Sequence, residues 1–321
     1  MICHSGKQTG LGHLSRTVSI SNMLKKKFKA NIKILIIGKL PNDNMFNIKS
    51  FKIIDLKNNF SNVPIKDEFD LIFFDLDPKF IPTKLSIFLD KVSSFKAKLI
   101  SIDGLMNFAS VFDLIFIPSF YIRLKKNYKY KTKIVYGWDS YILNKKKVKK
   151  IWKPGNTILV LTGGSDIDSL GKSWPKLFEK YLPKGSKIIW ISGPFAKKID
   201  IPINKRIYIK EYRAIKNLNN FIYQANYAVT YYGVSFFELL YANIPTVTFP
   251  AKKHKSKLRS ELNSIKQFNL SEVARDKDQA IKLLIKLIKN NKRAFTIATN
   301  ARKMVKVSGL LKLEKEIKKL I

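Results

Sequence analysis

The chain has 321 residues, of which 61 are Lys or Arg and 23 are Asp or Glu, so its formal net charge is +38. This length is enough for two domains with cores of their own. The composition, with 45% hydrophobic and 12% aromatic residues, excludes an intrinsically disordered chain. A single cysteine, Cys3, excludes a disulfide scaffold and a cysteine-based zinc site. No apolar run approaches the ~20 residues of a membrane-spanning helix, and no apolar signal-peptide segment follows Met1. We therefore expect a cytoplasmic protein.

The positive charge is spread along the whole sequence. A nucleic-acid-binding protein would gather Lys and Arg on one face, and no zinc finger, RNP-like motif or helix-turn-helix spacing occurs. We therefore expect a solvated basic surface and no specific nucleic-acid partner. A non-catalytic basic protein that binds nucleic acid or an anionic membrane is the alternative from a different functional class.

Short apolar strands alternate with helical segments, which is typical of parallel α/β domains. The expected strands cover residues 32–37, 51–54, 71–74, 98–102, 114–117 and 134–136 in the first half, and residues 157–162, 187–192, 206–210, 227–231 and 245–249 in the second. Asp75, Asp77 and Asp103 follow two of these strands, at the sheet edge where such domains bind ligands.

A lysine-rich segment at residues 145–150 interrupts this alternation, and Pro154-Gly155 follows it. We therefore expect an N-terminal domain over 1–144, a linker over 145–156 and a C-terminal domain over 157–321 that ends in a helical tail. In this tail Ile281, Leu284 and Ile288 share one helix face opposite lysines. The pattern predicts a helix packed on the domain, with a peripheral membrane contact as the alternative.

The segment Thr9-Gly10-Leu11-Gly12-His13-Leu14-Ser15-Arg16 is the first candidate site. Gly10 and Gly12 let a loop turn tightly and bring its backbone close to a ligand. A helix that begins near His13 would present free N–H groups to an anion, and His13 is placed for acid–base chemistry there. The simpler interpretation is a turn in which His13 only neighbours the helix cap. His4 is expected near the same loop.

Two further loops follow strands of the second half. In Thr162-Gly163-Gly164-Ser165-Asp166, the glycines allow the backbone to approach a phosphate, and Asp166 either meets the ligand or caps the next turn.

In Gly233-Val234-Ser235-Phe236-Phe237-Glu238, Ser235 is a good N-cap whose neighbouring amides would face an anion. Ser-x-x-Glu is a capping box, which the spacing favours, whereas the alternative places Glu238 on the hydroxyls of a ribose.

Other chemistries are excluded by missing motifs. The three histidines are dispersed and lack metal-ligand spacing, so we expect no metal and no cofactor. No G-x-S-x-G elbow, Walker A motif or complete G-x-G-x-x-G occurs, which excludes serine hydrolases, P-loop NTPases and dehydrogenases.

The ordered set of loops resembles one known family. Gly10 to Arg16 looks like the G-x-G-H-x-x-R opening of the nucleotide-sugar hydrolases of pseudaminic acid biosynthesis and the related spore-coat polysaccharide biosynthesis proteins. Gly163-Gly164-Ser165-Asp166 is similar to that family's G-G-S-D loop. The segments that also fit are Tyr136-Gly137, Gly233 through Glu238, and Ala242-Asn243-Ile244-Pro245.

The resemblance implies a GT-B-like α/β fold, with two Rossmann-like doubly wound parallel-sheet domains facing a cleft. It implies that His13 is the general base at the anomeric carbon and that Glu238 binds the ribose. The other residues that it places at the nucleotide sugar are Gly10, Gly12, Arg16, Gly163, Gly164, Ser165, Asp166, Gly233, Val234 and Ser235.

The expected function is hydrolysis of a nucleotide-activated, UDP-linked amino sugar to free sugar and nucleoside diphosphate, in the biosynthesis of a surface nonulosonic acid or polysaccharide. We expect a monomer that needs no metal, because helix N-termini and Lys or Arg can stabilise the departing diphosphate. The alternative is a GT-B glycosyltransferase that moves the sugar to a glycan or lipid acceptor. The family's Asn-Gln pair after residues 246–250 is missing, and Glu261 or Asn263 are the nearest replacements.

Overall fold

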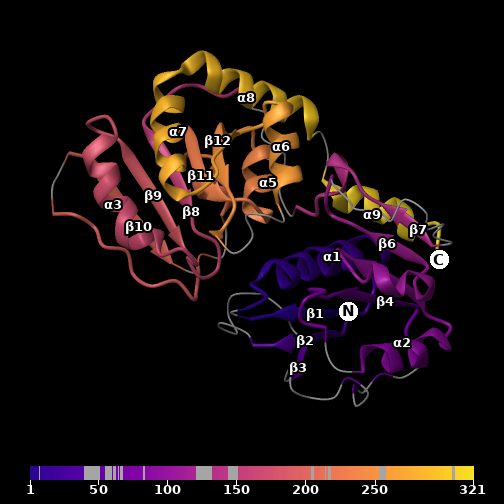
Figure 1. The fold of residues 1–321 in the computed structure, drawn as a ribbon. Coiled ribbons are helices and arrows are strands. Elements are labelled where there is room, and N and C mark those ends of the chain that lie inside the picture. Colours follow the sequence, from indigo (N-terminus) through magenta and orange to yellow (C-terminus); the bar gives the residue numbers. More distant parts are fainter. Residues whose placement is uncertain are drawn as a thin grey trace. The chain divides into compact units, whose positions relative to one another are not determined.

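The computed structural model describes residues 1–6, 8–39, 51–54, 60, 63, 65, 68–81, 84–120, 132–143, 151–203, 206–213, 215, 218–252, 258–305 and 308–321. Within these, the chain forms two compact units, one made of residues 1–144 with 307–321 and the other of residues 145–306. Both are Rossmann-like α/β units, as predicted (Figure 1).

The first unit is built on a parallel sheet whose described strands follow the order β3-β2-β1-β4-β5-β6-β7. The strands are β1 Ile2–Ser5, β2 Ile34–Gly38, β3 Phe51–Ile54, β4 Leu71–Asp75, β5 Lys98–Ile102, β6 Leu114–Phe116 and β7 Lys133–Val135. The order reverses between β1 and β4, which is the switch point where doubly wound sheets bind ligands.

The second unit repeats this topology in a parallel sheet of order β10-β9-β8-β11-β12-β13. Its strands are β8 Thr157–Leu161, β9 Lys187–Ser192, β10 Tyr208–Arg213, β11 Tyr227–Tyr231, β12 Thr246–Phe249 and β13 Glu272–Val273. Here the order reverses between β8 and β11.

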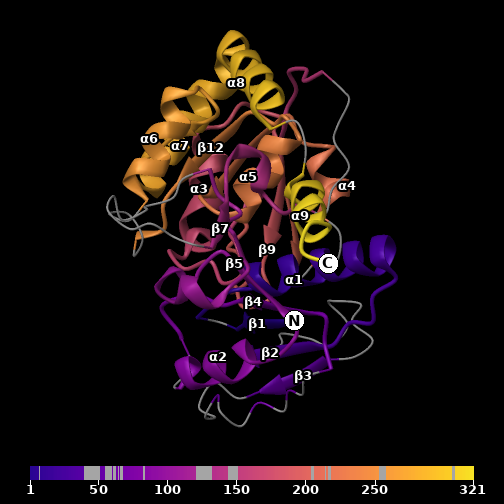
Figure 2. The same cartoon turned by 90° about the vertical axis from the view of Figure 1, so that its right-hand side faces the viewer.

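Helices cover both faces of the first sheet (Figure 2). Helices α1 (Gly12–Phe28) and α9 (Gly309–Ile317) lie on one face, where Leu14 and Leu313 share a buried cluster with Phe73 of β4. Helix α2 (Leu85–Ser93) and the short helix η3 (Met106–Val111) lie on the other face, with Phe74 of the same strand. The alternation of neighbouring strand residues between two cores is the period-2 geometry of a buried strand.

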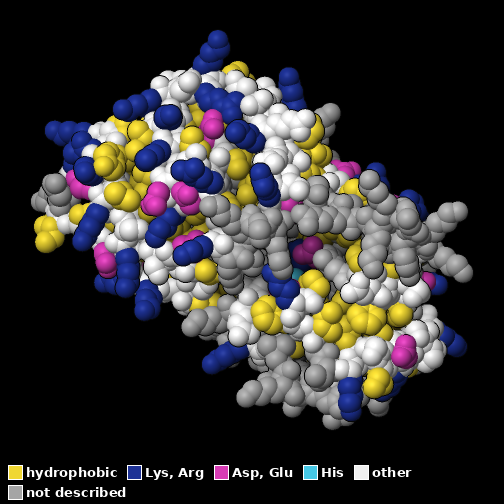
Figure 3. Space-filling model, viewed as in Figure 1, with side chains coloured by type: hydrophobic (Ala, Val, Ile, Leu, Met, Phe, Trp, Pro, Cys, Tyr) yellow, Lys and Arg dark blue, Asp and Glu magenta, His cyan; other side chains and the backbone are white. Residues whose placement is uncertain are grey.

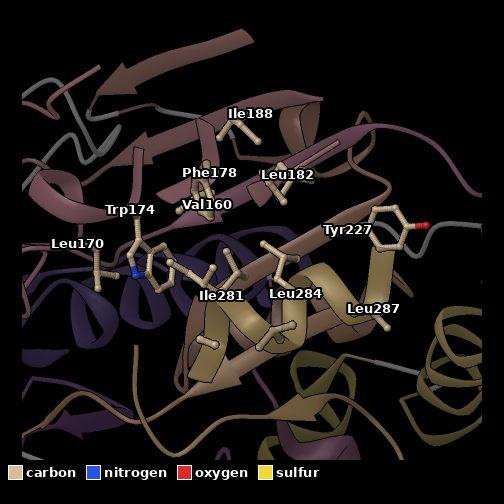
Figure 4. Packing of buried hydrophobic residues seen from close by; sticks show 14 of the residues in the cluster. Val160, Leu170, Trp174, Phe178, Leu182, Ile188, Tyr227, Ile281, Leu284 and Leu287 are labelled. Atoms are coloured by element: carbon tan, nitrogen blue, oxygen red, sulfur yellow. The ribbon is translucent and has the colours of Figure 1, made fainter. Parts of the chain in front are cut away.

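The second sheet is covered in the same way. Helices α3 (Leu170–Tyr181) and α7 (Lys277–Lys289) pack Trp174, Phe178, Ile281 and Leu284 against one face (Figure 4). The opposite face is covered by α4 (Asn219–Ile222) and α5 (Val234–Tyr241). Helix α6 (Arg259–Gln267) packs beside β13, and α8 (Asn291–Met304) packs on α5 and α7.

The apolar face of the predicted tail helix is buried within its own unit. Ile281, Leu284 and Leu287 of α7 are at most 4% exposed, and Ile285 and Ile288 pack against the same cluster. Of the two predicted arrangements, α7 therefore has the one in which the helix packs on its domain, and its apolar face is not open to a membrane. Within the described ranges, no helix is both long and apolar enough to cross a bilayer.

The end of the chain differs from the predicted C-terminal domain over 157–321, because α9 belongs to the first unit. The Gly309 N–H donates to Tyr141 O at 2.6 Å, and Ser308 Oγ donates to Leu143 O at 2.8 Å. A Cβ on Gly309 would lie 2.2 Å from Ser140 O, so glycine permits this close approach.

The predicted linker, 145–156, is described only from residue 151. There Trp152 Nε1–H donates to Asn226 O at 2.6 Å, so this part packs on the second unit.

Candidate active site

The first glycine loop connects β1 to α1 at the carboxyl edge of the first sheet. The N–H groups of Gly6 and Gly10 donate to each other's carbonyl oxygens at 3.2 and 2.8 Å, which closes a narrow loop. Gly10 has a φ of +74°, a left-handed conformation that favours glycine. Helix α1 begins at Gly12, slightly before the predicted start, so His13 lies in its first turn.

His13 is paired with a carboxylate from the neighbouring strand. Its Nδ1 lies 2.7 Å from Oδ1 of Asp75, the last residue of β4, and the His13 side chain is 12% exposed. Arg16 Nη2 also lies 3.1 Å from this Nδ1, but Nη2 donates to Asp75 Oδ1 at 2.6 Å. An ionised carboxylate only accepts hydrogen bonds, so we assign the proton of the 2.7 Å contact to Nδ1 of His13. In the neutral ring, Nε2 then carries the lone pair and is free of this contact. A histidine held by a carboxylate in this way is suited to act as a base through Nε2.

Arg16, one turn along α1, joins two carboxylates. Its Nε and Nη2 donate to Asp75 at 3.0 and 2.6 Å, and its Nη1 donates to Asp103 Oδ2 at 2.6 Å. Burial by itself raises the pKa of Asp75, but the positive charges of Arg16 and His13 outweigh it, so the pKa lies below its usual range. The Asp75 carboxylate therefore stays ionised. The sequence predicts that Arg16 binds the ligand. In the structure, its guanidinium donates hydrogen bonds to Asp75 and Asp103 of the protein itself.

A second histidine lies beside this network. His4 is wholly buried at the end of β1, and its ring centroid is 6.2 Å from that of His13, with the rings edge to face. Its Nδ1 accepts a hydrogen bond from the Asp77 N–H at 2.9 Å. Burial, and next the charge of His13, lower the pKa of His4 to about 4, so its ring is neutral near pH 7.

Sequence reasoning noted Asp75, Asp77 and Asp103 only as polar residues at strand ends. Asp75 lies 62 positions from its partner His13, and Asp103 lies 87 positions from its partner Arg16. The signal that was available is their common place at the carboxyl edge of a parallel sheet.

The second glycine loop follows β8, beside β11, at the switch point of the second sheet. Gly163 has a φ of +69°, and the Phe195 N–H donates to Gly164 O at 3.0 Å. A Cβ on Gly193 would lie only 2.2 Å from Gly163 O, so glycine at 193 lets the two segments touch. The loop, including Ser165, is thus held against the segment that follows β9.

Asp166 caps the helix that follows this loop. Its Oδ1 and Oδ2 accept hydrogen bonds from the N–H groups of Leu170 and Gly171, both at 2.9 Å, in the first turn of α3. Burial raises the pKa of Asp166, and these two hydrogen bonds oppose that rise. The sequence left two roles open for Asp166, a contact with the ligand or a cap. Its hydrogen bonds in the structure are those of a cap.

The third loop differs from the capping-box prediction. Helix α5 begins at Val234 with Gly233 at its N-cap, so Ser235 lies inside the first turn and is not the N-cap that the motif requires. Glu238 is half-buried in the following turn of α5. Gly233 follows β11, the direct neighbour of β8, so the second and third loops meet at one edge of the sheet.

A cavity of the second unit lies elsewhere. It has a volume of about 920 Å³, and its lining includes Thr157, Lys187 and Tyr208, the first residues of three strands. It is therefore at the amino edge of the sheet and contains none of the predicted site residues. The paired, buried charges of the first unit and the glycine loops of both units lie at the carboxyl edges, which we take as the candidate site of each unit. Within the described ranges, no group of three or more His, Cys, Asp or Glu residues is placed to hold a metal.

Comparison with known proteins supports the architecture. No protein-family model and no curated protein sequence matches the chain. Among solved structures, MurG of Acinetobacter baumannii is 15% identical, with a TM-score of 0.63 and 99% of each chain covered.

Two similar structures contain nucleotides. MnaA of Staphylococcus aureus with UDP is 13% identical, with a TM-score of 0.60 over 100% of this chain and 96% of its own. The spinosyn rhamnosyltransferase SpnG with thymidine diphosphate is 11% identical, with a TM-score of 0.58 over 98% and 99%. Together with the two sheets, these similarities confirm the predicted GT-B fold. The narrower resemblance to pseudaminic acid hydrolases stays a prediction.

Proposed function

We propose that this chain is a glycosyltransferase that moves a sugar from a nucleotide donor to a hydroxyl group of a glycan or lipid acceptor. The observation that carries the proposal is the contact of His13 Nδ1 with the buried Asp75 carboxylate, at 2.7 Å, beside a glycine loop at a sheet switch point. This is the arrangement of a general base next to a binding loop.

The proposed reaction needs one base. His13 Nε2 takes the proton of the acceptor hydroxyl while the oxygen attacks the anomeric carbon of the sugar. The bond from that carbon to the diphosphate breaks, and the nucleoside diphosphate leaves with the electron pair. Asp75 stabilises the imidazolium that forms, and Arg16 keeps Asp75 ionised.

We assign the nucleotide to the second unit. The amides of the Gly163-Gly164 loop and of Val234 and Ser235 at the start of α5 supply donors for the diphosphate. Glu238, in the same helix, is the proposed ribose partner. Asp166, as the cap of α3, fixes the loop that carries the glycines.

Transfer, rather than hydrolysis, is supported by two observations. One similar structure is a rhamnosyltransferase with bound thymidine diphosphate. The Asn-Gln pair of the hydrolases that the sequence resembles is also missing after β12, where Asn263 is an exposed residue of α6.

Hydrolysis of a UDP-linked amino sugar is the second candidate. The ordered motifs Gly10 to Arg16 and Gly163 to Asp166 favour it. Water would then take the place of the acceptor hydroxyl, and His13 would keep its role.

The test follows the release of nucleoside diphosphate from UDP-, dTDP- and CMP-linked sugars, with and without glycan and lipid acceptors, with nucleoside monophosphate measured for the CMP donors. Release that needs an acceptor supports transfer, and release without one supports hydrolysis. We expect His13→Ala to abolish turnover and to leave UDP binding largely unchanged. Absence of turnover with every donor, together with polyanion binding that survives His13→Ala, would contradict both enzyme assignments.

A further inference from the structure

His4 has a partner on only one side of its ring. The Asp77 N–H donates to its Nδ1 at 2.9 Å, so Nδ1 carries no proton. In a neutral imidazole the one proton is then on Nε2. The lowering of the pKa to about 4, by burial and then by the charge of His13, is consistent with this neutral form.

The Nε2–H of His4 is a buried donor that lacks a hydrogen-bond acceptor within the described part of the chain. Buried polar groups in folded proteins are nearly always paired, so a donor left open in this way calls for an explanation. The ring that carries this unpaired donor lies beside the proposed base, because the ring centroids of His4 and His13 are 6.2 Å apart.

The two histidines present opposite hydrogen-bonding groups. The contact of His13 Nδ1 with Asp75 leaves Nε2 of His13 as an acceptor, whereas the contact of Asp77 with His4 leaves Nε2 of His4 as a donor. Two hydrogen bonds of about 2.8 Å that meet at one oxygen atom bring their nitrogens within about 5 Å. A centroid separation of 6.2 Å between the rings is compatible with one oxygen shared by both.

We propose that His4 is a second catalytic residue, whose Nε2–H donates a hydrogen bond to the attacking oxygen from which His13 removes the proton. This inference rests on the proposed function. The attacking oxygen has two lone pairs: one accepts from His4, and the other forms the bond to the anomeric carbon. Its proton passes to His13 Nε2. His4 holds the oxygen in position and keeps its own proton throughout.

Two conservative substitutions separate this role from an anchoring role. In His4→Asn, the amide oxygen can accept from Asp77 in the manner of Nδ1, but no donor reaches the position of Nε2. In His4→Gln, the amide nitrogen can supply the donor near that position. We expect His4→Asn to lower kcat on the order of 10²-fold, the usual effect of removing one oriented donor. We expect His4→Gln to recover most of that loss, and both variants to bind UDP as the native chain does.

The measurements are kcat, KM and the thermal unfolding midpoint of the native chain and of both variants. Native kcat in His4→Asn would overturn the inference, because the Nε2–H would then be unused. Equal kcat losses in the two variants would also overturn it, since the donor that Gln restores would then recover no turnover. If the native chain itself does not turn over nucleotide sugars, the proposed function fails, which differs from a failure of His4 in an active enzyme.

Discussion

At the carboxyl edge of the first sheet, the partner of each side chain determines what that side chain can do. Asp75 is almost completely buried, yet it remains ionised because Arg16 donates to both of its oxygens. The same carboxylate accepts from His13 Nδ1 and so fixes the ring's tautomer and its orientation. Arg16 therefore acts on His13 through Asp75 and also lies against it, with Nη2 3.1 Å from His13 Nδ1, although the sequence motif alone suggests a direct contact with the substrate.

The Asp75→Asn substitution tests this dependence. An amide can donate to Nδ1 and so favours the tautomer with its proton on Nε2, which cannot act as a base there. We expect kcat to fall on the order of 10³- to 10⁴-fold with little change in KM, by analogy with the same change in a serine-protease triad. The control is Asp103→Asn, which removes the charge of the other Arg16 partner but leaves the Asp75 contact in place. Equal losses in the two variants would contradict a special role of Asp75.

The sequence predicts some of these residues and not others, for a physical reason. The glycines and His13 are neighbours in the chain, so their spacing alone indicates a loop and a helix start. Asp75 lies 62 positions from His13, and their contact exists only because β4 is placed beside β1 in the sheet. Nothing in the spacing of residues fixes that strand order, so the sequence could single out His13 as a candidate but could not indicate its partner.

At the scale of elements, strands were predicted well because strands buried on both faces form continuous apolar runs. The missed strand β13 has two half-buried residues, too few for such a run. The assignment of α9 failed for a different reason. Its apolar face predicts that the helix is packed, but it does not say against which sheet, and α9 packs beside α1 on the first.

The placement of α9 is testable with two leucines of that helix. Leu313 is fully buried in the cluster with Leu14 and Phe73, whereas Leu311 is 51% exposed. We expect Leu313→Ala to destabilise the first unit by about 2–5 kcal/mol, the usual cost of such a cavity, and Leu311→Ala to have a small effect. Hydrogen exchange measures both changes. Leu313→Ala should speed exchange in peptides of β1 and α1, and faster exchange in β8 and β11 instead would contradict the assignment.

At the scale of the whole molecule, the charge of +38 comes from Lys and Arg residues that are spread along the sequence. On the face drawn in Figure 3, Lys and Arg side chains are dispersed among hydrophobic and uncharged ones. A dispersed charge attracts any anion, whereas a binding site for a diphosphate uses a few donors at fixed positions. The two kinds of binding therefore differ in their dependence on salt.

Salt titration separates the two, because affinity for a polyanion falls with the number of counterions released. Between about 50 and about 500 mM salt, we expect DNA binding to weaken on the order of 10³-fold or more and UDP binding about 10-fold or less. Equilibrium binding of labelled DNA and of UDP measures both, and His13→Ala should alter neither slope. Submicromolar DNA binding at the higher salt concentration would contradict this expectation, because dispersed lysines cannot supply it. That outcome would indicate that the positive charge serves a dedicated nucleic-acid site and not the binding of a small anionic substrate.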